Sequence, residues 1–302
     1  MNGAIRDTAV KAINFAINDK VAFYLCGLFY RVGVPLHTAA SSRHLLGGKR
    51  SLILAPHPDD DILGCGGTIL ATNSVAEWHC VYITDGSLSH HPTLGPRQLG
   101  EMRKSEAEEV CKQAGVRPLF LDHPNEAVKI EDSHCLTQLL VELRPDIVYL
   151  PFFMDFHVDH RVTNTLFLEA SKTARIQPIV ISYQVQSCIP KEFVNLGFDI
   201  SDFFEEKRRL LTLYRSQSMY FGNVLKMNRC LAASAGRSGA CEVFWQADFR
   251  RFEAVVDAWA KVVGLGDVKY HRPINNRISL VYDVFRDWKA RRKVLKALAD
   301  WI

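Results

Sequence analysis

The stretch "SLILAPHPDDDILGCGG" (Ser51–Gly67) decides the fold prediction, because an apolar run, a charged turn and a glycine cluster follow one another within it. "SLILAP" is continuously apolar, which is typical of a strand buried on both faces of a parallel sheet. Asp59, Asp60 and Asp61 follow almost at once. Adjacent negative charges repel each other, so their place at the end of a buried strand needs a physical explanation.

The order of apolar strand, polar loop and helix recurs downstream. "HCVYITDG", "RPLFLDHP", "DIVYLPFF" and "PIVISYQV" are predicted strands, and "GGTILATNS", "RQLGEMRKSEAEEVCKQAGV", "CLTQLLVELRP" and "DHRVTNTLFLEASKTA" are predicted helices. Strands that alternate with helices indicate parallel pairing with helical crossovers. We therefore predict an α/β fold, a Rossmann-like three-layer αβα sandwich with a mostly parallel sheet and helical N- and C-terminal extensions.

Three parts are expected along the chain: a helical N-terminal extension (1–48), the α/β domain (49–250), and a helical C-terminal extension packed on the same domain (251–302). The apolar segment "VAFYLCGLFY" (Val21–Tyr30) has half the length of a membrane span. "SLVYDVFRDWKARRKVLKALADWI" (279–302) has the pattern of a basic amphipathic helix with aromatic residues. This pattern is compatible with peripheral contact to an anionic membrane, or with docking on the domain or at the interface of a homo-oligomer.

Composition is that of an ordinary globular protein, with 48% hydrophobic and 23% charged residues among 302. A net charge of +4 is too small to indicate a nucleic-acid partner, and none is predicted. The eight cysteines form no CxxC pair, which favours reduced, buried thiols. The first residues lack the pattern of a signal peptide. We expect a cytoplasmic protein, with a peripheral place on the inner membrane face as the alternative.

Polar side chains gather where the predicted strands end. Asp59–Asp61 follow the first strand, Asp85 the second, Asp122 and His123 the third, and "MDFHVDH" (Met154–His160) the fourth. In open α/β sheets the ligand crevice lies at the carboxyl ends of the strands. The sequence therefore places a site at this edge.

Two of these clusters contain the residue types that bind zinc: His57, Asp59 and Asp60 in one, and His157, Asp159 and His160 in the other. A catalytic zinc ion typically has three protein ligands and a water molecule. A His-Pro-Asp-Asp turn can present His57 and one of the two aspartates to one ion, with the other carboxylate beside the water. His160 could supply the third ligand. A divalent cation would also offset the charge of the aspartates.

A simpler interpretation makes the aspartates the first residues of a helix, where negative charge complements the helix dipole. His157 and His160 would then be surface residues. The presence of both clusters at the same edge of a buried sheet favours the metal site.

These motifs resemble those of the LmbE/PIG-L family of zinc-dependent de-N-acetylases. "APHPDDDILGCGG" is similar to the family pattern A-H-P-D-D-E-x-x-x-x-G-G, and "DFHVDH" matches D-x-H-x-D-H. "LGEMRKSEA", "DISDFFEEKRRLLTLYRSQ" and "ACEVF" resemble later family segments in the same order. The resemblance runs from Ser51 to Trp245, with Asp61 where glutamate is usual and Val158 where proline is common.

The resemblance implies a role for each motif residue. His57, Asp60 and His160 would be metal ligands, Asp59 the general base, and His157 the group that stabilises the oxyanion or protonates the leaving amine. Asp159 is expected to orient one of the two nearby histidines, Asp155 to orient His157, and Asp61 to support the ligands from behind. Zn²⁺ is the expected cofactor, although Fe²⁺ and other divalent ions accept the same ligand types.

Residues expected to contact substrate are Arg103, Asp85, His91 and Arg237. For Arg103 the alternative is a surface ion pair with Glu106, and for His91 an ordinary solvated loop. The glycines of "GCGG" are expected to permit a tight turn and close packing near the metal.

The implied function is a zinc-dependent hydrolase that removes an N-acetyl group from an amino sugar or sugar conjugate of the N-acetylglucosamine type. The substrate would be a small molecule or lipid-linked, in glycan or secondary-metabolite biosynthesis. One alternative is a nucleotide-dependent Rossmann enzyme, but Ile69 stands where the third glycine of its fingerprint belongs. A hydrolase of a non-sugar N-acyl substrate is a second alternative, and a non-catalytic binding protein is a third.

Overall fold

The structure, a computed structural model, describes residues 34–89, 91–217, 221–263, 292 and 294–301. The apolar segment Val21–Tyr30, the rest of the N-terminal extension before residue 34 and most of the basic C-terminal segment lie outside the described residues. Within the described ranges, no helix is both long enough and apolar enough to cross a bilayer.

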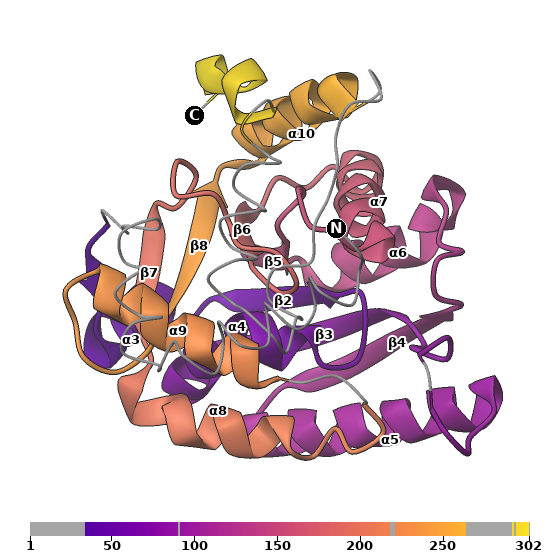
Figure 1. Cartoon of the computed structure of the whole chain (residues 1–302). Helices are drawn as coiled ribbons and strands as arrows, with labels where there is room; N and C mark the ends of the chain where they lie inside the picture. The colour runs from indigo at the N-terminus through magenta and orange to yellow at the C-terminus, as the bar shows by residue number, and fades with distance from the viewer. Residues whose placement is uncertain (1–33, 90, 218–220, 264–291, 293, 302) are drawn as a thin grey trace, which may run out of the picture.

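The described strands form one eight-stranded sheet in the order β1-β7-β8-β6-β5-β2-β3-β4 (Figure 1). The five predicted strands are all present and pair in parallel as β2–β6. β8 is antiparallel to both of its neighbours, β6 and β7. The predicted mostly parallel sheet is therefore confirmed. The strands are β1 (Leu36–His37), β2 (Arg50–Ala55), β3 (Glu77–Thr84), β4 (Arg117–His123), β5 (Ile147–Pro151), β6 (Ile179–Tyr183), β7 (Leu196–Asp199) and β8 (Cys241–Ala247).

Helices cover both faces of this sheet, which confirms the three-layer arrangement (Figure 1). One face carries α3 (Ala39–Leu46), α4 (Asp60–Thr72), α5 (Pro96–Ala114), α8 (Phe204–Leu211) and α9 (Gly222–Ser234). The other carries α6 (Ser133–Leu143), α7 (Val158–Ala174) and α10 (Phe249–Val263). Short 3-10 turns are η1 (Ile130–Asp132), η2 (Ser201–Phe203) and η3 (Ala299–Trp301).

The sequence suggested that the α/β domain ends at residue 250. Helix α10 runs across this position and packs against α7, β6 and β8. The division of the chain into three parts stays a prediction.

The chain reverses its direction across the sheet at β2, which lies between β3 and β5. Ile53 of β2 pairs with Cys80 on one side and with Tyr149 on the other. From β2 the chain proceeds outward through β3 and β4, and β5 and β6 then extend the sheet in the opposite direction. Such a switch point opens a crevice at the carboxyl ends of the two diverging strands. The loops after β2 and β5 therefore meet there.

The glycine cluster lies inside helix α4, so the predicted tight turn is wrong, whereas close packing is confirmed. A Cβ atom added at Gly64 would lie 2.2 Å from Cδ2 of Tyr183, and one at Gly67 would lie 2.6 Å from Ile200. Only glycine lets α4 approach these side chains so closely. The helix also begins earlier than predicted, with Asp60 and Asp61 in its first turn. The simpler interpretation, which made the aspartates the first residues of a helix, therefore describes the position of Asp60 and Asp61 correctly.

Candidate metal centre at the switch point

Three side chains from the two loops place one donor atom each at the corners of a small triangle. Nδ1 of His57 lies 3.1 Å from Oδ2 of Asp60. Nε2 of His160 lies 3.2 Å from the same oxygen and 3.3 Å from Nδ1 of His57. All three residues are buried. His57 and Asp60 come from the turn after β2, and His160 from the first turn of α7 after β5.

The size of this triangle fits a tetrahedral metal ion. Zinc bonds of 2.0–2.2 Å to nitrogen and oxygen imply ligand-to-ligand distances of about 3.3–3.5 Å. The observed edges are shorter by only a few tenths of an ångström. Two imidazoles and one carboxylate on one face of an ion leave a fourth position for water. The chemistry and spacing of His57, Asp60 and His160 therefore suit a catalytic zinc ion.

His157 belongs to a wider cluster with the other two histidines. The three imidazoles offer nitrogens within 4.8 Å of one another and could also hold a metal ion. The ring of His157 lies 4.6 Å from that of His57. Its side chain is 16% exposed, against 9% for His57 and 0% for His160. Because the triangle with Asp60 has shorter edges, it fits a single ion better than the three-histidine set.

His157 is the N-cap residue of α7, and its Nδ1 accepts a hydrogen bond of 3.2 Å from the backbone N–H of Asp159. Burial, followed by the charges of His57 and His160, lowers the pKa of His157 to about 4. The imidazole is therefore neutral at pH 7. Since Nδ1 accepts, the proton of the neutral ring is on Nε2.

Asp59 has a strained backbone and an unpartnered carboxylate oxygen. Its φ angle is 132°, a region that L residues rarely adopt. Its Oδ2 is buried and has no hydrogen-bond partner in the described part of the chain, and the nearest cation is Arg103 at 3.8 Å. Burial, followed by the charge of Asp60, raises the pKa of Asp59 to about 8. A carboxyl with a strained backbone and an oxygen that accepts no hydrogen bond, beside the triangle of His57, Asp60 and His160, is suited to hold and release a proton.

The turn that carries Asp59 is held at the carbonyl of Pro58. That oxygen accepts hydrogen bonds from Nη2 of Arg103 at 3.3 Å and from Nε2 of Gln217 at 2.8 Å. Arg103 is 2% exposed and also donates to the carbonyl of Gly86. Glu106 binds the backbone N–H of Ser216 at 2.8 Å. The alternative of an Arg103–Glu106 surface pair is thus wrong, because Arg103 is buried behind the turn.

Two carboxylates lie beside the histidines of the triangle, in a pairing different from the expected one. Oδ2 of Asp159 lies 3.0 Å from Nε2 of His57, and Oδ1 of Asp155 lies 3.1 Å from Nδ1 of His160. Asp155 was expected to orient His157, and it also accepts a hydrogen bond from the backbone N–H of that residue at 2.9 Å. Carboxylates behind metal-binding histidines fix the ring orientation and increase ligand basicity.

These contacts set the protonation of the triangle. Burial alone would lower the pKa of His160. The carboxylates of Asp60 and Asp155 outweigh burial and raise this pKa well above its usual range. Burial alone would raise the pKa of Asp60. The two histidines outweigh burial and lower this pKa well below its usual range. A metal ion that binds here replaces the proton of His160, because a ligand imidazole must be neutral.

Asp61 does not face a histidine. Its carboxylate accepts hydrogen bonds from the hydroxyls of Tyr82 at 2.8 Å and Tyr214 at 3.3 Å. Burial raises the pKa of Asp61 to about 6. The two tyrosines were not identified from the sequence, since nothing in their spacing links them to the aspartates.

The remaining expected substrate residues have local roles or none that the structure assigns. The carboxylate of Asp85 accepts a hydrogen bond of 2.9 Å from the backbone N–H of Ser87. Nδ1 of His91 accepts the N–H of Leu94 at 3.1 Å, which supports the description of an ordinary loop. Arg237 is exposed in the loop before β8. Their contact with substrate stays a prediction.

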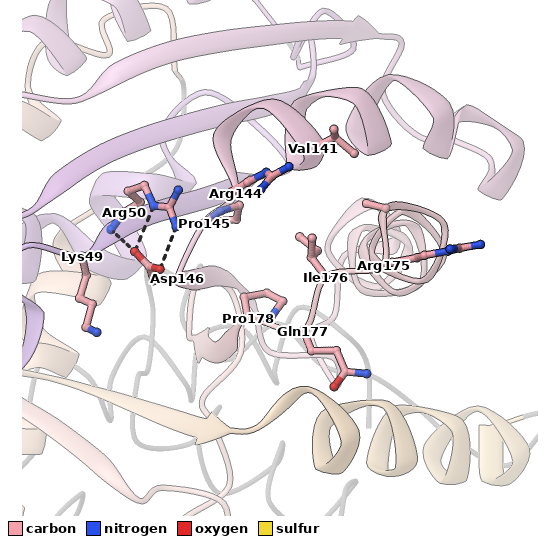
Figure 2. A pocket seen from close by; sticks show the side chains of 11 residues that line it. Lys49, Arg50, Val141, Arg144, Pro145, Asp146, Arg175, Ile176, Gln177 and Pro178 are labelled. Atoms are coloured by element: carbon pink, nitrogen blue, oxygen red, sulfur yellow. Dashed lines mark hydrogen bonds and ion pairs between the residues drawn. The ribbon is translucent and has the colours of Figure 1, made fainter.

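A separate pocket of about 640 Å³ lies at the opposite edge of the sheet (Figure 2). It is lined by residues at or before the starts of β2, β5 and β6, including Arg50, the first residue of β2, whose guanidinium pairs with Asp146 at 3.0 Å. Figure 2 shows the side chain of Arg175 pointing away from Arg50 and Arg144. The cations around this pocket therefore do not converge on one point, and the chemistry is concentrated at the switch point.

Comparison with known proteins agrees with this geometry. Residues 52–171 match the family model described as PIG-L: GlcNAc-PI de-N-acetylase. A diacetylchitobiose deacetylase from Thermococcus kodakarensis is 28% identical over 187 residues, which cover 56% of this chain and 70% of the relative.

Two solved structures share the fold. N,N'-diacetylchitobiose deacetylase from Pyrococcus horikoshii has a TM-score of 0.59 at 24% identity, over 67% of this chain and 85% of that one. GalB, the 4-carboxy-2-hydroxymuconate hydratase from Pseudomonas putida, has a TM-score of 0.58 at 15% identity, over 65% and 95%. Since one of them is a hydratase, the fold alone does not decide the reaction.

Proposed function

We propose that this chain is a metal-dependent hydrolase that removes an N-acetyl group from an amino sugar or sugar conjugate, since residues 52–171 match the family model of the PIG-L (LmbE-like) de-N-acetylases. The triangle of His57, Asp60 and His160, beside an Asp59 carboxylate whose Oδ2 accepts no hydrogen bond, carries this proposal. The name of the Thermococcus relative, a diacetylchitobiose deacetylase, supports a sugar of the N-acetylglucosamine type.

The proposed ligands are His57, Asp60 and His160, and the proposed ion is Zn²⁺, with Fe²⁺ as the alternative that the same donors accept. When bound, such an ion supplies Lewis-acid polarisation of the amide carbonyl and lowers the pKa of a water molecule. Asp159 and Asp155 orient His57 and His160 for this purpose.

Asp59 is the proposed base. It accepts a proton from the attacking water, whose oxygen forms a bond to the amide carbon. The pKa of Asp59, raised to about 8, lies near neutrality, where a carboxyl can both take up and release a proton. It then gives the proton to the amide nitrogen as the C–N bond breaks, so acetate and a free amine leave.

His157 is the proposed stabiliser of the oxyanion. The neutral ring has its proton on Nε2, since Nδ1 accepts from Asp159. It would therefore donate a hydrogen bond to the developing negative charge as a neutral group, and it would not need to be protonated first.

The substrate class is tested by amine release. Purified protein of measured metal content is incubated with N-acetylglucosamine, chitobiose-type and lipid-linked N-acetylglucosamine conjugates, and the free amine is quantified. The proposal predicts release from at least one sugar. No release from any sugar by metal-loaded protein, together with release from simple N-acyl amines, would shift the assignment to the non-sugar alternative.

A cytoplasmic location belongs to this proposal as well. The cysteines in the described ranges are free thiols, all but Cys135 buried, which supports a reducing compartment. Peripheral membrane contact and a homo-oligomer rest on segments outside the described residues.

A further inference from the structure

Lys207 and Glu242 form a buried ion pair that the proposed reaction does not use. Nζ of Lys207 lies 2.7 Å from Oε1 of Glu242, and their side chains are 0% and 1% exposed. Both residues lie in the late segments that resemble the family, "DISDFFEEKRRLLTLYRSQ" and "ACEVF". A buried ion pair is seldom retained for stability alone, because removing two charges from water costs about as much as their attraction returns.

The pair packs against the middle of helix α4. Glu242 accepts hydrogen bonds from the N–H of Gly67 at 2.8 Å and from the N–H and hydroxyl of Thr68 at 2.9 and 2.6 Å. Lys207 donates to the carbonyl of Leu63 at 2.9 Å. Leu63 and Gly67 are the two positions that an uninterrupted helix joins to each other. The ion pair therefore binds both sides of one helical turn.

Leu63 connects this turn to the metal centre. Its carbonyl accepts from Lys207, and its N–H donates to the carbonyl of Asp59 at 2.9 Å. Asp60 follows directly as the first residue of α4. A displacement of Leu63 would therefore move both the strained Asp59 backbone and the Asp60 carboxylate.

We propose that Lys207 and Glu242 are positioning residues of the metal centre, which fix the first turn of α4 so that Asp60 closes the triangle with His57 and His160. The inference rests on the proposed function, because it assumes that the triangle binds a metal ion. It assigns a purpose to two late motif residues that lie far from the reacting atoms along the chain.

The test is Zn²⁺ affinity of full-length variants, titrated below their melting temperatures after the fold has been checked by circular dichroism. In the double variant Lys207→Met, Glu242→Gln neither residue leaves a buried charge. We expect its Zn²⁺ dissociation constant to rise by about tenfold or more, as for other residues that orient metal ligands. The matched control is Thr72→Val, which removes a buried hydroxyl bonded to the carbonyl of Thr68 at 2.7 Å in the same helix, without touching the ion pair.

A second variant keeps the test open if the double variant does not fold. Thr68→Val removes one donor to Glu242 with little change in shape, and we expect weaker Zn²⁺ binding than in Thr72→Val. Affinities equal to those of the control, in whichever of the two variants folds, would overturn the positioning role even if melting temperatures fall. A wild-type protein that binds no Zn²⁺ would instead overturn the proposed metal function itself.

Discussion

Asp59 and Asp60 are adjacent, yet their environments push their pKa values in opposite directions. Asp60 contacts two imidazoles, which hold its pKa low against the effect of burial. Asp59 is buried with an unpartnered oxygen, and its pKa is about 8. Two neighbouring carboxyls whose pKa values are pushed apart typically have different catalytic roles. At the residue scale this division supports the proposed mechanism, in which Asp60 would bind the metal and Asp59 would move the proton.

Substitution of these residues should separate metal binding from turnover. Asp60→Ala and His160→Ala should each lose the metal. Asp59→Asn should retain it while kcat falls by about 10²–10⁴-fold, because only the proton transfer is removed. Metal content after desalting and initial rates of amine release are measured on the same samples. Loss of metal from Asp59→Asn would show that the two carboxylates have been assigned the wrong way round.

His157→Ala distinguishes the two ligand sets. If His157 only donates a hydrogen bond to the oxyanion, the variant keeps its metal and loses about 10²–10³-fold in kcat. Metal analysis beside His157→Gln, which restores an N–H donor, provides the comparison. A variant that purifies without metal would favour the three-histidine set instead.

Asp61 should give the stability of the protein a measurable pH dependence. Its pKa is about 6 in the folded chain, against about 3.9 for an unfolded aspartate. The folded state therefore binds this proton more tightly, and the favourable contribution is lost as the pH rises from about 4 through 6. Relative to Asp61→Asn, the wild-type free energy of unfolding should fall by about 2 kcal/mol between pH 4 and 6, and by about 3 kcal/mol in all between pH 3 and 8. Urea unfolding at equal metal content checks this, and a pH-independent difference would contradict it.

The motif residues could be predicted from the sequence, but their pairing could not. Asp159 orients His57, which lies after another strand, and Asp155 orients His160 in place of the expected His157. Such contacts depend on how two loops meet across the switch point. The φ angle of Asp59 and the tyrosines around Asp61 depend on the same packing, so no local pattern indicates them.

At the scale of elements, helix α4 depends on the absence of side chains on one face. Gly64 lies under the ring of Tyr183, whose hydroxyl donates to the carbonyl of Leu54 at 2.9 Å. The helix therefore rests directly on β6, and β6 is tied to β2. This contact fixes the distance between the aspartates and the strand ends.

Gly64→Ala should destabilise the protein although alanine favours helices. The added Cβ would meet Tyr183 at 2.2 Å, and overpacking of this kind costs about 1–3 kcal/mol in the free energy of unfolding. Gly100→Ala in α5 is the matched control, because its nearest neighbour would be at an ordinary 3.6 Å. Thermal unfolding of both variants is compared, and equal melting temperatures would contradict the packing argument.

The five parallel strands were predictable because each is a continuous apolar run, whereas β1, β7 and β8 were not. β1 has two residues, and β7 contains Gly197, which packs against Leu36. β8 (CEVFWQA) has the charged Glu242 and the polar Gln246 beside its apolar residues, which hides the pattern of a buried strand. Its charge is compensated by Lys207 of helix α8, which the local sequence does not reveal.

For the whole molecule, strand order explains why two distant motifs form one site. β2 and β5 are neighbours in the sheet although β3 and β4 lie between them in sequence. The fold class predicts a crevice at their carboxyl ends, and the histidine motifs occupy the loops that begin there. The identity of the sugar is not encoded in this arrangement, since the same fold is also found in a hydratase.

The central claim is that a metal ion held by His57, Asp60 and His160 makes this chain an N-deacetylase. The most direct test removes metal from the full-length protein with a chelator and titrates Zn²⁺ back while amine release from an N-acetylglucosamine conjugate is followed. The account predicts that activity disappears on chelation and returns in proportion to added Zn²⁺ up to about one equivalent per chain, the stoichiometry of a single three-ligand site. Undiminished activity in protein shown to be free of metal would contradict it.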